Sequence, residues 1–201
     1  MPNATGSAPK IIPIALQAYS LRDDAKADFP GTLRRIKEIG YEAIEFAGYF
    51  GMSSRELRSL LDDLGLRAVS SHVGYQELRE NLDRQIEYSV EIGAKYLICP
   101  GYGAEDRDGW LKFADFLSAA GEKCRAAGLV IGYHNHSREL ERIDGEYMLD
   151  ILFDAVKSDA VVAQLDLGWV MYAGVDPIAY LRKYAGRCPL VHVKDFDENK
   201  V

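Results

Sequence analysis

Residues 37–46, Lys-Glu-Ile-Gly-Tyr-Glu-Ala-Ile-Glu-Phe, carry the pattern from which the fold of this chain is predicted. A helical run ends at Gly40, and a short apolar strand follows. Glycine readily adopts the left-handed conformation that closes a helix, so Gly40 marks a turn from helix to strand. The same pattern recurs at four more glycines, which are Gly65, Gly93, Gly128 and Gly186.

The apolar periodicity on both sides of these turns predicts seven strands that alternate with helices. The strands are expected near residues 12–20, 41–47, 66–73, 94–100, 129–136, 161–167 and 189–196. The helices are expected near residues 29–39, 53–64, 78–92, 108–127, 145–157 and 176–185. Short apolar strands separated by helices are typical of a parallel sheet with right-handed crossovers.

Seven such units in a row predict an α/β fold, a TIM (β/α)8 barrel that is truncated after its seventh strand. No Gly-x-Gly-x-x-Gly motif follows the first predicted strand, which argues against a doubly wound nucleotide-binding sheet. We expect residues 1–10 to form a flexible lead-in and residues 11–201 to form one barrel domain without its eighth unit. We interpret the chain as a piece of a longer barrel, and the alternative is that a partner chain closes the sheet.

The composition limits the class of partner. The chain has 201 residues, 48% of them hydrophobic, which suits one substantial core. Its net charge is −7 without a basic stripe, which predicts no nucleic-acid partner. The apolar stretches are shorter than the roughly 20 residues of a membrane span, and no signal peptide is recognisable, so we expect a cytoplasmic protein. The three cysteines show no metal-knuckle spacing, and the oligomeric state, a homo-oligomer included, stays open.

Polar residues gather at the C-terminal ends of the predicted strands, where barrels of this class carry their active sites. The set consists of Gln17, Tyr19, Glu45, Ser70, His72, His134, His136, Gln164, Asp166, His192 and Lys194. All four histidines of the chain belong to it. This concentration is the strongest functional signal in the sequence.

Three members of this set are candidate metal ligands. Asp166 and His192 lie on neighbouring predicted strands at similar depth, and His134 comes from the strand before them. Imidazole and carboxylate groups are common ligands of divalent ions. A single histidine or glutamate at a strand end is as readily explained by an ordinary hydrogen bond, which is the alternative for His72 and Glu45.

The aromatic residues divide into two groups. Trp110, Phe113 and Phe116 have helical spacing, which predicts core positions. Trp169 follows Asp166 on the predicted loop after strand six, where it would form a pocket wall and stack on a sugar ring.

Several motifs, taken in order, resemble the xylose isomerase-like TIM barrels, the sugar phosphate isomerase/epimerase family. The matching segments are Leu-Gln-Ala-Tyr-Ser-Leu-Arg (16–22), Gly-Tyr-Glu-Ala-Ile-Glu-Phe-Ala-Gly (40–48), Ser-Ser-His-Val-Gly (70–74), Gly-Tyr-His-Asn-His-Ser-Arg-Glu-Leu (132–140), Leu-Asp-Leu-Gly-Trp (165–169) and His-Val-Lys-Asp (192–195). The resemblance covers essentially the whole chain.

The resemblance implies a divalent ion, which is Mn, Mg, Co or Zn, held by residues of strands five to eight. Asp166 and His192 match the family's strand-six and strand-seven ligands. His134 stands where the family has a glutamate, and the strand-eight glutamate position lies beyond Val201. In the family these two glutamates also transfer protons. This sequence therefore differs from the family pattern at the two residues that act as acid and base, and Glu139 is the nearby carboxylate that can substitute.

The implied activity is that of a sugar isomerase or epimerase acting through an enediolate, with a small-molecule sugar as substrate. The ion stabilises the enediolate, and Glu139 or His136 acts as the base. Lys194 stabilises the oxyanion or binds a polar substrate group. Glu45 and His72 are expected to contact substrate hydroxyls.

Three alternatives remain. The same site can expel a leaving group, which makes a lyase or dehydratase on a keto-sugar or keto-inositol. A DNA-repair endonuclease of the related barrel group requires more metal ligands and a basic rim, which four histidines and a charge of −7 do not provide. A non-catalytic, sugar-binding degenerate barrel is consistent with the missing strand-five glutamate and strand eight.

Overall fold

The computed structural model describes residues 12–156 and 161–196. Seven strands form one sheet, and every neighbouring pair in it is parallel. In order across the sheet they are β1 (Leu16–Gln17), β2 (Ala43–Phe46), β3 (Arg67–His72), β4 (Tyr96–Cys99), β5 (Val130–His134), β8 (Val161–Asp166) and β9 (Leu190–His192). The strands follow one another in chain order, as in a TIM barrel, so the predicted fold class is confirmed. The predicted lead-in, residues 1–10, lies outside the described residues.

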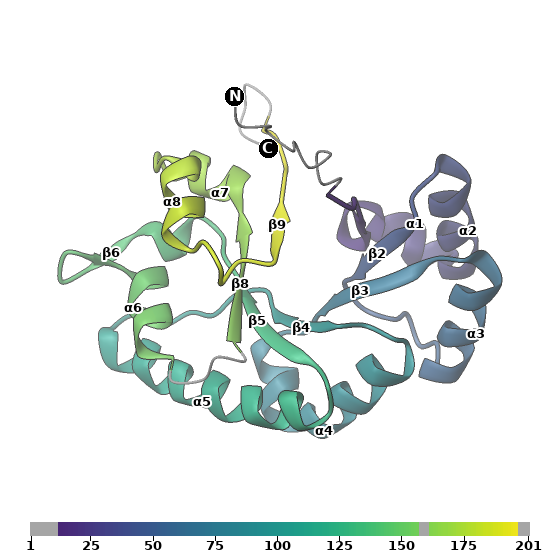
Figure 1. The fold of residues 1–201 in the computed structure, drawn as a ribbon, viewed down its shortest axis with the longest axis horizontal. Helices are drawn as coiled ribbons and strands as arrows, with labels where there is room; N and C mark the ends of the chain where they lie inside the picture. The colour runs from purple at the N-terminus through teal and green to yellow at the C-terminus, as the bar shows by residue number, and fades with distance from the viewer. Residues whose placement is uncertain (1–11, 157–160, 197–201) are drawn as a thin grey trace, which may run out of the picture.

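The helices follow the strands and pack on the outer side of the curved sheet (Figure 1). They are α1 (Arg22–Ala27), α2 (Phe29–Ile39), α3 (Ser54–Leu64), α4 (Tyr75–Glu91), α5 (Arg107–Ala126), α6 (Met148–Ala155), α7 (Leu167–Tyr172) and α8 (Pro177–Lys183). Two 3-10 turns, η1 (Ala18–Leu21) and η2 (Arg138–Leu140), complete the connections. In the described part of the chain, no helix combines the length and the apolar character that crossing a membrane requires.

The helix-to-strand turns follow the sequence pattern. Gly40 ends α2 with φ 112°, and Gly65 ends α3 with φ 59°. Both angles lie in the left-handed region that glycine adopts at low cost. At its other end α3 is closed by a capping box, in which Ser53 and Glu56 each satisfy a backbone N–H of the other.

The structure differs from the sequence prediction after β5 and after β8. A hairpin of β6 (Arg142–Ile143) and β7 (Glu146–Tyr147) replaces the start of the helix predicted from residue 145. Its turn residues Asp144 and Gly145 both have positive φ, 52° and 85°. An Asp-Gly pair favours this tight turn, and it was the signal that the helical periodicity concealed.

The segment after β8 was predicted to be a loop, but it forms helix α7. The Asp166 side chain accepts a hydrogen bond from the Trp169 backbone N–H at 2.9 Å, which caps the helix at its first turn. Trp169 therefore lies on a short helix and not on a loop. The helix α1 was also not predicted, and the strands β1 and β9 are shorter than expected.

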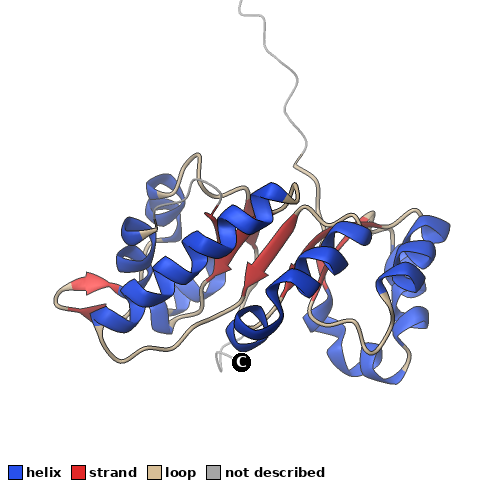
Figure 2. Ribbon diagram, turned by 90° about the horizontal axis from the view of Figure 1, so that it is seen from below, coloured by secondary structure: helices blue, strands red, loops and turns tan. Residues whose placement is uncertain are grey.

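Two apolar clusters fill the space between the sheet and the helices. Viewed from below, α4 and α5 lie across the outer face of the sheet (Figure 2). Trp110 and Phe113 of α5 are buried there, and Phe116 packs against them, so their predicted core positions are confirmed. The smaller cluster lies under β2 and contains Ile44 and Phe46. No helix in the described residues covers the inner face of the sheet (Figure 1).

Candidate functional site

A cavity of about 1300 Å³ occupies the inner face of the sheet. Strands from both edges contribute to its wall. All predicted site residues except Glu139 line it: Glu45, His72, His134, His136, Asp166, Trp169, His192 and Lys194. The structure thus brings the polar strand ends together, since residues up to 149 positions apart in the chain line one cavity.

Three imidazoles form the centre of this wall. The rings of His134 and His192 have centroids 4.5 Å apart, and His72 lies 4.9 Å from His134 and 5.5 Å from His192. One ring nitrogen from each lies within 4.8 Å of the other two. Burial, followed by the neighbouring imidazoles, holds the pKa of His134 well below its usual value, so this ring is neutral.

Glu45 connects strands that are distant in the sheet. Its Oε1 accepts from His192 Nε2 at 2.6 Å and lies 3.1 Å from His72 Nε2. Its Oε2 accepts from Ser70 Oγ and from Gln164 Nε2, each at 2.5 Å. Burial alone raises the pKa of Glu45, but the hydrogen bonds with His192 and His72 outweigh it and hold this pKa well below the usual range. The carboxylate is thus ionised, buried and fully bonded.

Asp166 lies on the other side of the imidazoles. Its Oδ2 is 3.9 Å from His134 Nε2 and 3.8 Å from His192 Nδ1, while its Oδ1 caps α7. Burial raises the pKa of Asp166, and the Trp169 N–H and the His192 ring oppose that rise. The three predicted ligands His134, Asp166 and His192 are therefore adjacent, and the structure adds His72 to the group.

The mouth of the cavity carries a cation between aromatic rings. Lys194 Nζ lies 4.2 Å from the centroid of Trp169 and 4.6 Å from that of Phe196. The Trp169 ring was predicted to stack on a sugar, but in the structure the ammonium group of Lys194 lies against this ring in a cation–π contact. His136 lies 5.6 Å from Trp169 and 5.0 Å from His134, so it belongs to the same mouth.

Glu139 is buried behind the cavity wall. Its Oε1 accepts from the Tyr133 hydroxyl at 2.6 Å, and its Oε2 accepts from the His136 backbone N–H at 2.9 Å. The Tyr133 oxygen in turn accepts from the Tyr102 N–H at 2.9 Å. Burial, together with the charge of Glu139, raises the pKa of Tyr133 well above its usual value, so this hydroxyl remains a donor. The geometry of Glu139 is that of a group that holds the loop carrying His136.

Sequence reasoning assigned no role to three residues that shape this site. Gln164 links Glu45 to His72, Asn135 Oδ1 accepts from the Asp166 backbone N–H at 3.0 Å, and Phe196 contacts Lys194. Gln164 has the same strand parity as Asp166, which was the available signal. Nothing in the sequence pattern pointed to Asn135 or Phe196.

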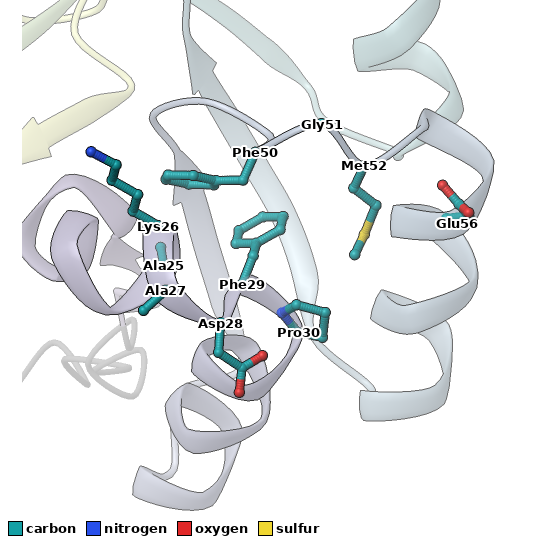
Figure 3. A pocket seen from close by; sticks show the side chains of 10 residues that line it. All are labelled: Ala25, Lys26, Ala27, Asp28, Phe29, Pro30, Phe50, Gly51, Met52 and Glu56. Carbon is teal, nitrogen blue, oxygen red and sulfur yellow. The ribbon is translucent and has the colours of Figure 1, made fainter.

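A second hollow of about 440 Å³ lies between α1 and the loop after β2 (Figure 3). Its aromatic rings, Phe29 and Phe50, face each other with centroids 5.0 Å apart. Its two carboxylates are engaged in helix capping, Asp28 with the Gly31 N–H and Glu56 with Ser53. The larger cavity, which is lined by the histidines, Asp166 and Lys194, is therefore the candidate functional site.

The residues of the larger cavity fit a divalent metal ion. His134 Nδ1 is buried and has no hydrogen-bond partner among the described residues, although an unpaired buried polar atom is costly. The surrounding donors, which are imidazole nitrogens and a carboxylate oxygen, are those that bind zinc-type ions. The other ring nitrogen of His134, Nε2, faces Asp166 Oδ2 at 3.9 Å, so it is the nitrogen that an ion shared with Asp166 would contact.

Comparisons with known proteins show the family and the fold. The sequence profile of the xylose isomerase-like TIM barrels matches residues 33–200. An inosose dehydratase of Geobacillus kaustophilus is 27% identical over 188 residues, which cover 81% of this chain, and the chain spans 60% of the length of that relative. The solved structure of a sugar phosphate isomerase/epimerase from Parabacteroides distasonis is 26% identical, with a TM-score of 0.79 over 97% of this chain and 80% of the other. The structure of an IolI protein with a bound zinc atom shares the fold, with a TM-score of 0.73 at 14% identity over 93% and 74% of the two chains.

Proposed function

Since the chain belongs to the xylose isomerase-like TIM barrel family, we propose that it acts on a sugar or a cyclic polyol ketone by removing a proton from the carbon next to the carbonyl group. The observation that supports this most strongly is that His136, Lys194 and the candidate ligands His134, Asp166 and His192 line one cavity. A base, a cation and a metal-binding group side by side are what stabilising an enediolate requires.

The roles follow from position. His136 is the base, because it lines the cavity and its backbone N–H is fixed by Glu139 at 2.9 Å. Lys194, held between Trp169 and Phe196, places its positive charge where the carbonyl oxygen gains negative charge. Glu139 is a positioning residue, since both of its oxygens are bonded within the protein.

His134, Asp166 and His192 would hold the divalent ion. When bound, such an ion supplies positive charge next to the oxygen that becomes anionic. The protein excludes water from one side of this position by burying His134 and Asp166, and it fixes Asp166 through the Asn135 and Trp169 contacts.

Dehydration is the outcome we favour, because the Geobacillus relative is an inosose dehydratase. In that reaction His136 removes the proton, the C–H electron pair forms a carbon–carbon double bond, and the hydroxyl on the next carbon departs. The proton taken by His136 passes to this hydroxyl, which leaves as water. Isomerisation or epimerisation is the second candidate, favoured by the likeness to the Parabacteroides isomerase/epimerase, and it returns the proton to carbon instead.

The test is solvent exchange in D2O with a keto-inositol and a panel of ketoses, followed by NMR. We expect loss of the proton signal next to the carbonyl in the protein and in Lys123→Ala, a change on the outer helix α5. His136→Ala should lose the exchange by about 100-fold or more. An unsaturated ketone product identifies dehydration, and an epimer or an aldose identifies isomerisation. Substrate binding without exchange would contradict the proposal and favour a non-catalytic barrel.

A further inference from the structure

We propose that His72 is a third imidazole ligand of the site. Glu45 and Gln164 hold His72 and His192 in the tautomer that binds metal. The resulting donor set selects a zinc-type ion over magnesium. This inference rests on the proposed function, which requires a divalent ion held by His134, Asp166 and His192. It adds a ligand, a supporting pair of residues and a metal class.

The first support is the position of the ring. His72 comes from β3, which is separated in strand order by β4 from His134 on β5, and by β4, β5 and β8 from His192 on β9. Across the curved sheet its ring nevertheless lies parallel to that of His192, at an interplanar angle of 11°. A donor nitrogen of His72 lies within 4.8 Å of donor nitrogens of His134 and His192. Nitrogens bound about 2.1 Å from one tetrahedral zinc lie about 3.4 Å apart, so the rings would approach one another by up to about 1.4 Å to share an ion.

The second support is the direction of the hydrogen bonds around His72. Gln164 Nε2 donates to Glu45 Oε2 at 2.5 Å, so the other end of the amide, Oε1, faces His72 Nε2 at 2.7 Å. An amide oxygen only accepts, so His72 Nε2 carries the proton. The His72 Nδ1 therefore keeps its lone pair, which is the form of imidazole that coordinates a metal.

Glu45 fixes the tautomer of His192 in the way that Gln164 fixes that of His72. Its Oε1 accepts from His192 Nε2 at 2.6 Å, which leaves Nδ1 with a lone pair, and this Nδ1 lies 3.8 Å from Asp166 Oδ2. A carboxylate behind a metal-binding imidazole fixes its tautomer and raises its basicity. One carboxylate thus serves two imidazoles, because Glu45 Oε1 also lies 3.1 Å from His72 Nε2.

The third support is the kind of donor atom, since His134 Nε2 and His192 Nδ1 both face Asp166 Oδ2, at 3.9 and 3.8 Å. Together the three rings make a nitrogen-rich donor set with one carboxylate, Asp166. Such a set favours zinc, cobalt or nickel, whereas magnesium requires mainly oxygen ligands and retains its water.

The experiment is a titration of the metal-free protein with Co²⁺, followed by visible absorption, and repeated in excess Mg²⁺. It compares wild type with His72→Ala, Glu45→Gln and the control His136→Ala, which removes an imidazole from the same cavity outside the ligand group. We expect one Co²⁺ per chain in wild type and in the control, undisturbed by Mg²⁺. His72→Ala and Glu45→Gln should each weaken binding by about 10- to 100-fold.

The outcomes separate two failures. If wild type binds no Co²⁺, the metal step of the proposed function fails together with this inference. If wild type binds but His72→Ala binds equally well, or Mg²⁺ displaces Co²⁺ at similar concentration, only this inference fails. Should His72→Ala not fold, X-ray absorption of the zinc-loaded wild-type protein decides the question, because three imidazoles per zinc are expected and two would overturn the inference.

Discussion

On strand β8, Val161, Ala163 and Leu165 pack against the helices, whereas Gln164 and Asp166 of the same strand line the cavity. Strand β2 shows the same division, with Ile44 and Phe46 in the apolar cluster and Glu45 on the inner face. Successive side chains of a strand point to opposite faces, so one backbone supports both environments. The helix-covered face is held by apolar packing, and the inner face is held by hydrogen bonds between polar groups.

The largest effect should follow from loss of packing on the helix-covered face. The two tryptophans of the chain provide a matched pair. Trp110 is fully buried on α5, so Trp110→Ala should lower the free energy of unfolding by about 3–5 kcal/mol. Trp169→Ala at the cavity mouth should cost at most about 2 kcal/mol. Urea unfolding of both variants measures the difference, and equal losses would contradict the division between the two faces.

A smaller effect is expected at Glu139, which lies between the two faces. Glu139→Leu leaves the Tyr133 hydroxyl and the His136 N–H without their acceptor, so it should cost about 1–3 kcal/mol. Glu139→Gln keeps one acceptor and one donor there and should lose less. Both variants are followed by thermal unfolding.

The same Glu139→Gln variant distinguishes a positioning residue from a base. We expect it to keep measurable exchange in D2O, because His136 removes the proton. A complete loss of exchange in a variant that is as stable as wild type would instead make Glu139 the base.

The smallest effect on stability is expected at Lys194. Its ammonium group contacts Trp169 and Phe196 at the mouth, and such contacts contribute about 0.5–1 kcal/mol. Lys194→Met retains the length of the side chain and removes its charge, so the melting temperature should barely change while turnover falls by about 100-fold. Unchanged turnover would remove Lys194 from the mechanism.

The sequence was sufficient to predict what periodicity controls. Alternation along the strands placed Glu45, His72 and Asp166 on one face, and the glycine turns gave the order of helices and strands. It was not sufficient for contacts that depend on curvature. Glu45 meets Gln164 and His192 across 119 and 147 residues of chain, and no local pattern encodes such a pairing.

The sequence was also not sufficient to predict short helices that depend on a capping side chain. The helix α7 has six residues, too few for a periodic signal, and it forms because Asp166 caps it. The hydrogen bonds of Glu139 depend on how the chain turns at Asn135 and His136, so its candidacy as a base followed from its proximity in sequence alone.

The measurement that tests the account most directly is the metal content of Asp166→Asn beside that of Asp106→Asn. Both aspartates cap a helix, Asp166 through the Trp169 N–H and Asp106 through the Gly109 N–H at 2.8 Å, and asparagine caps about equally well. The account predicts near-stoichiometric zinc or cobalt in wild type and in Asp106→Asn, its loss in Asp166→Asn, and the same melting temperature for the metal-free form of all three proteins. Metal retained in Asp166→Asn, or absent from wild type after soaking, would contradict the assignment of the inner face as a metal-dependent site.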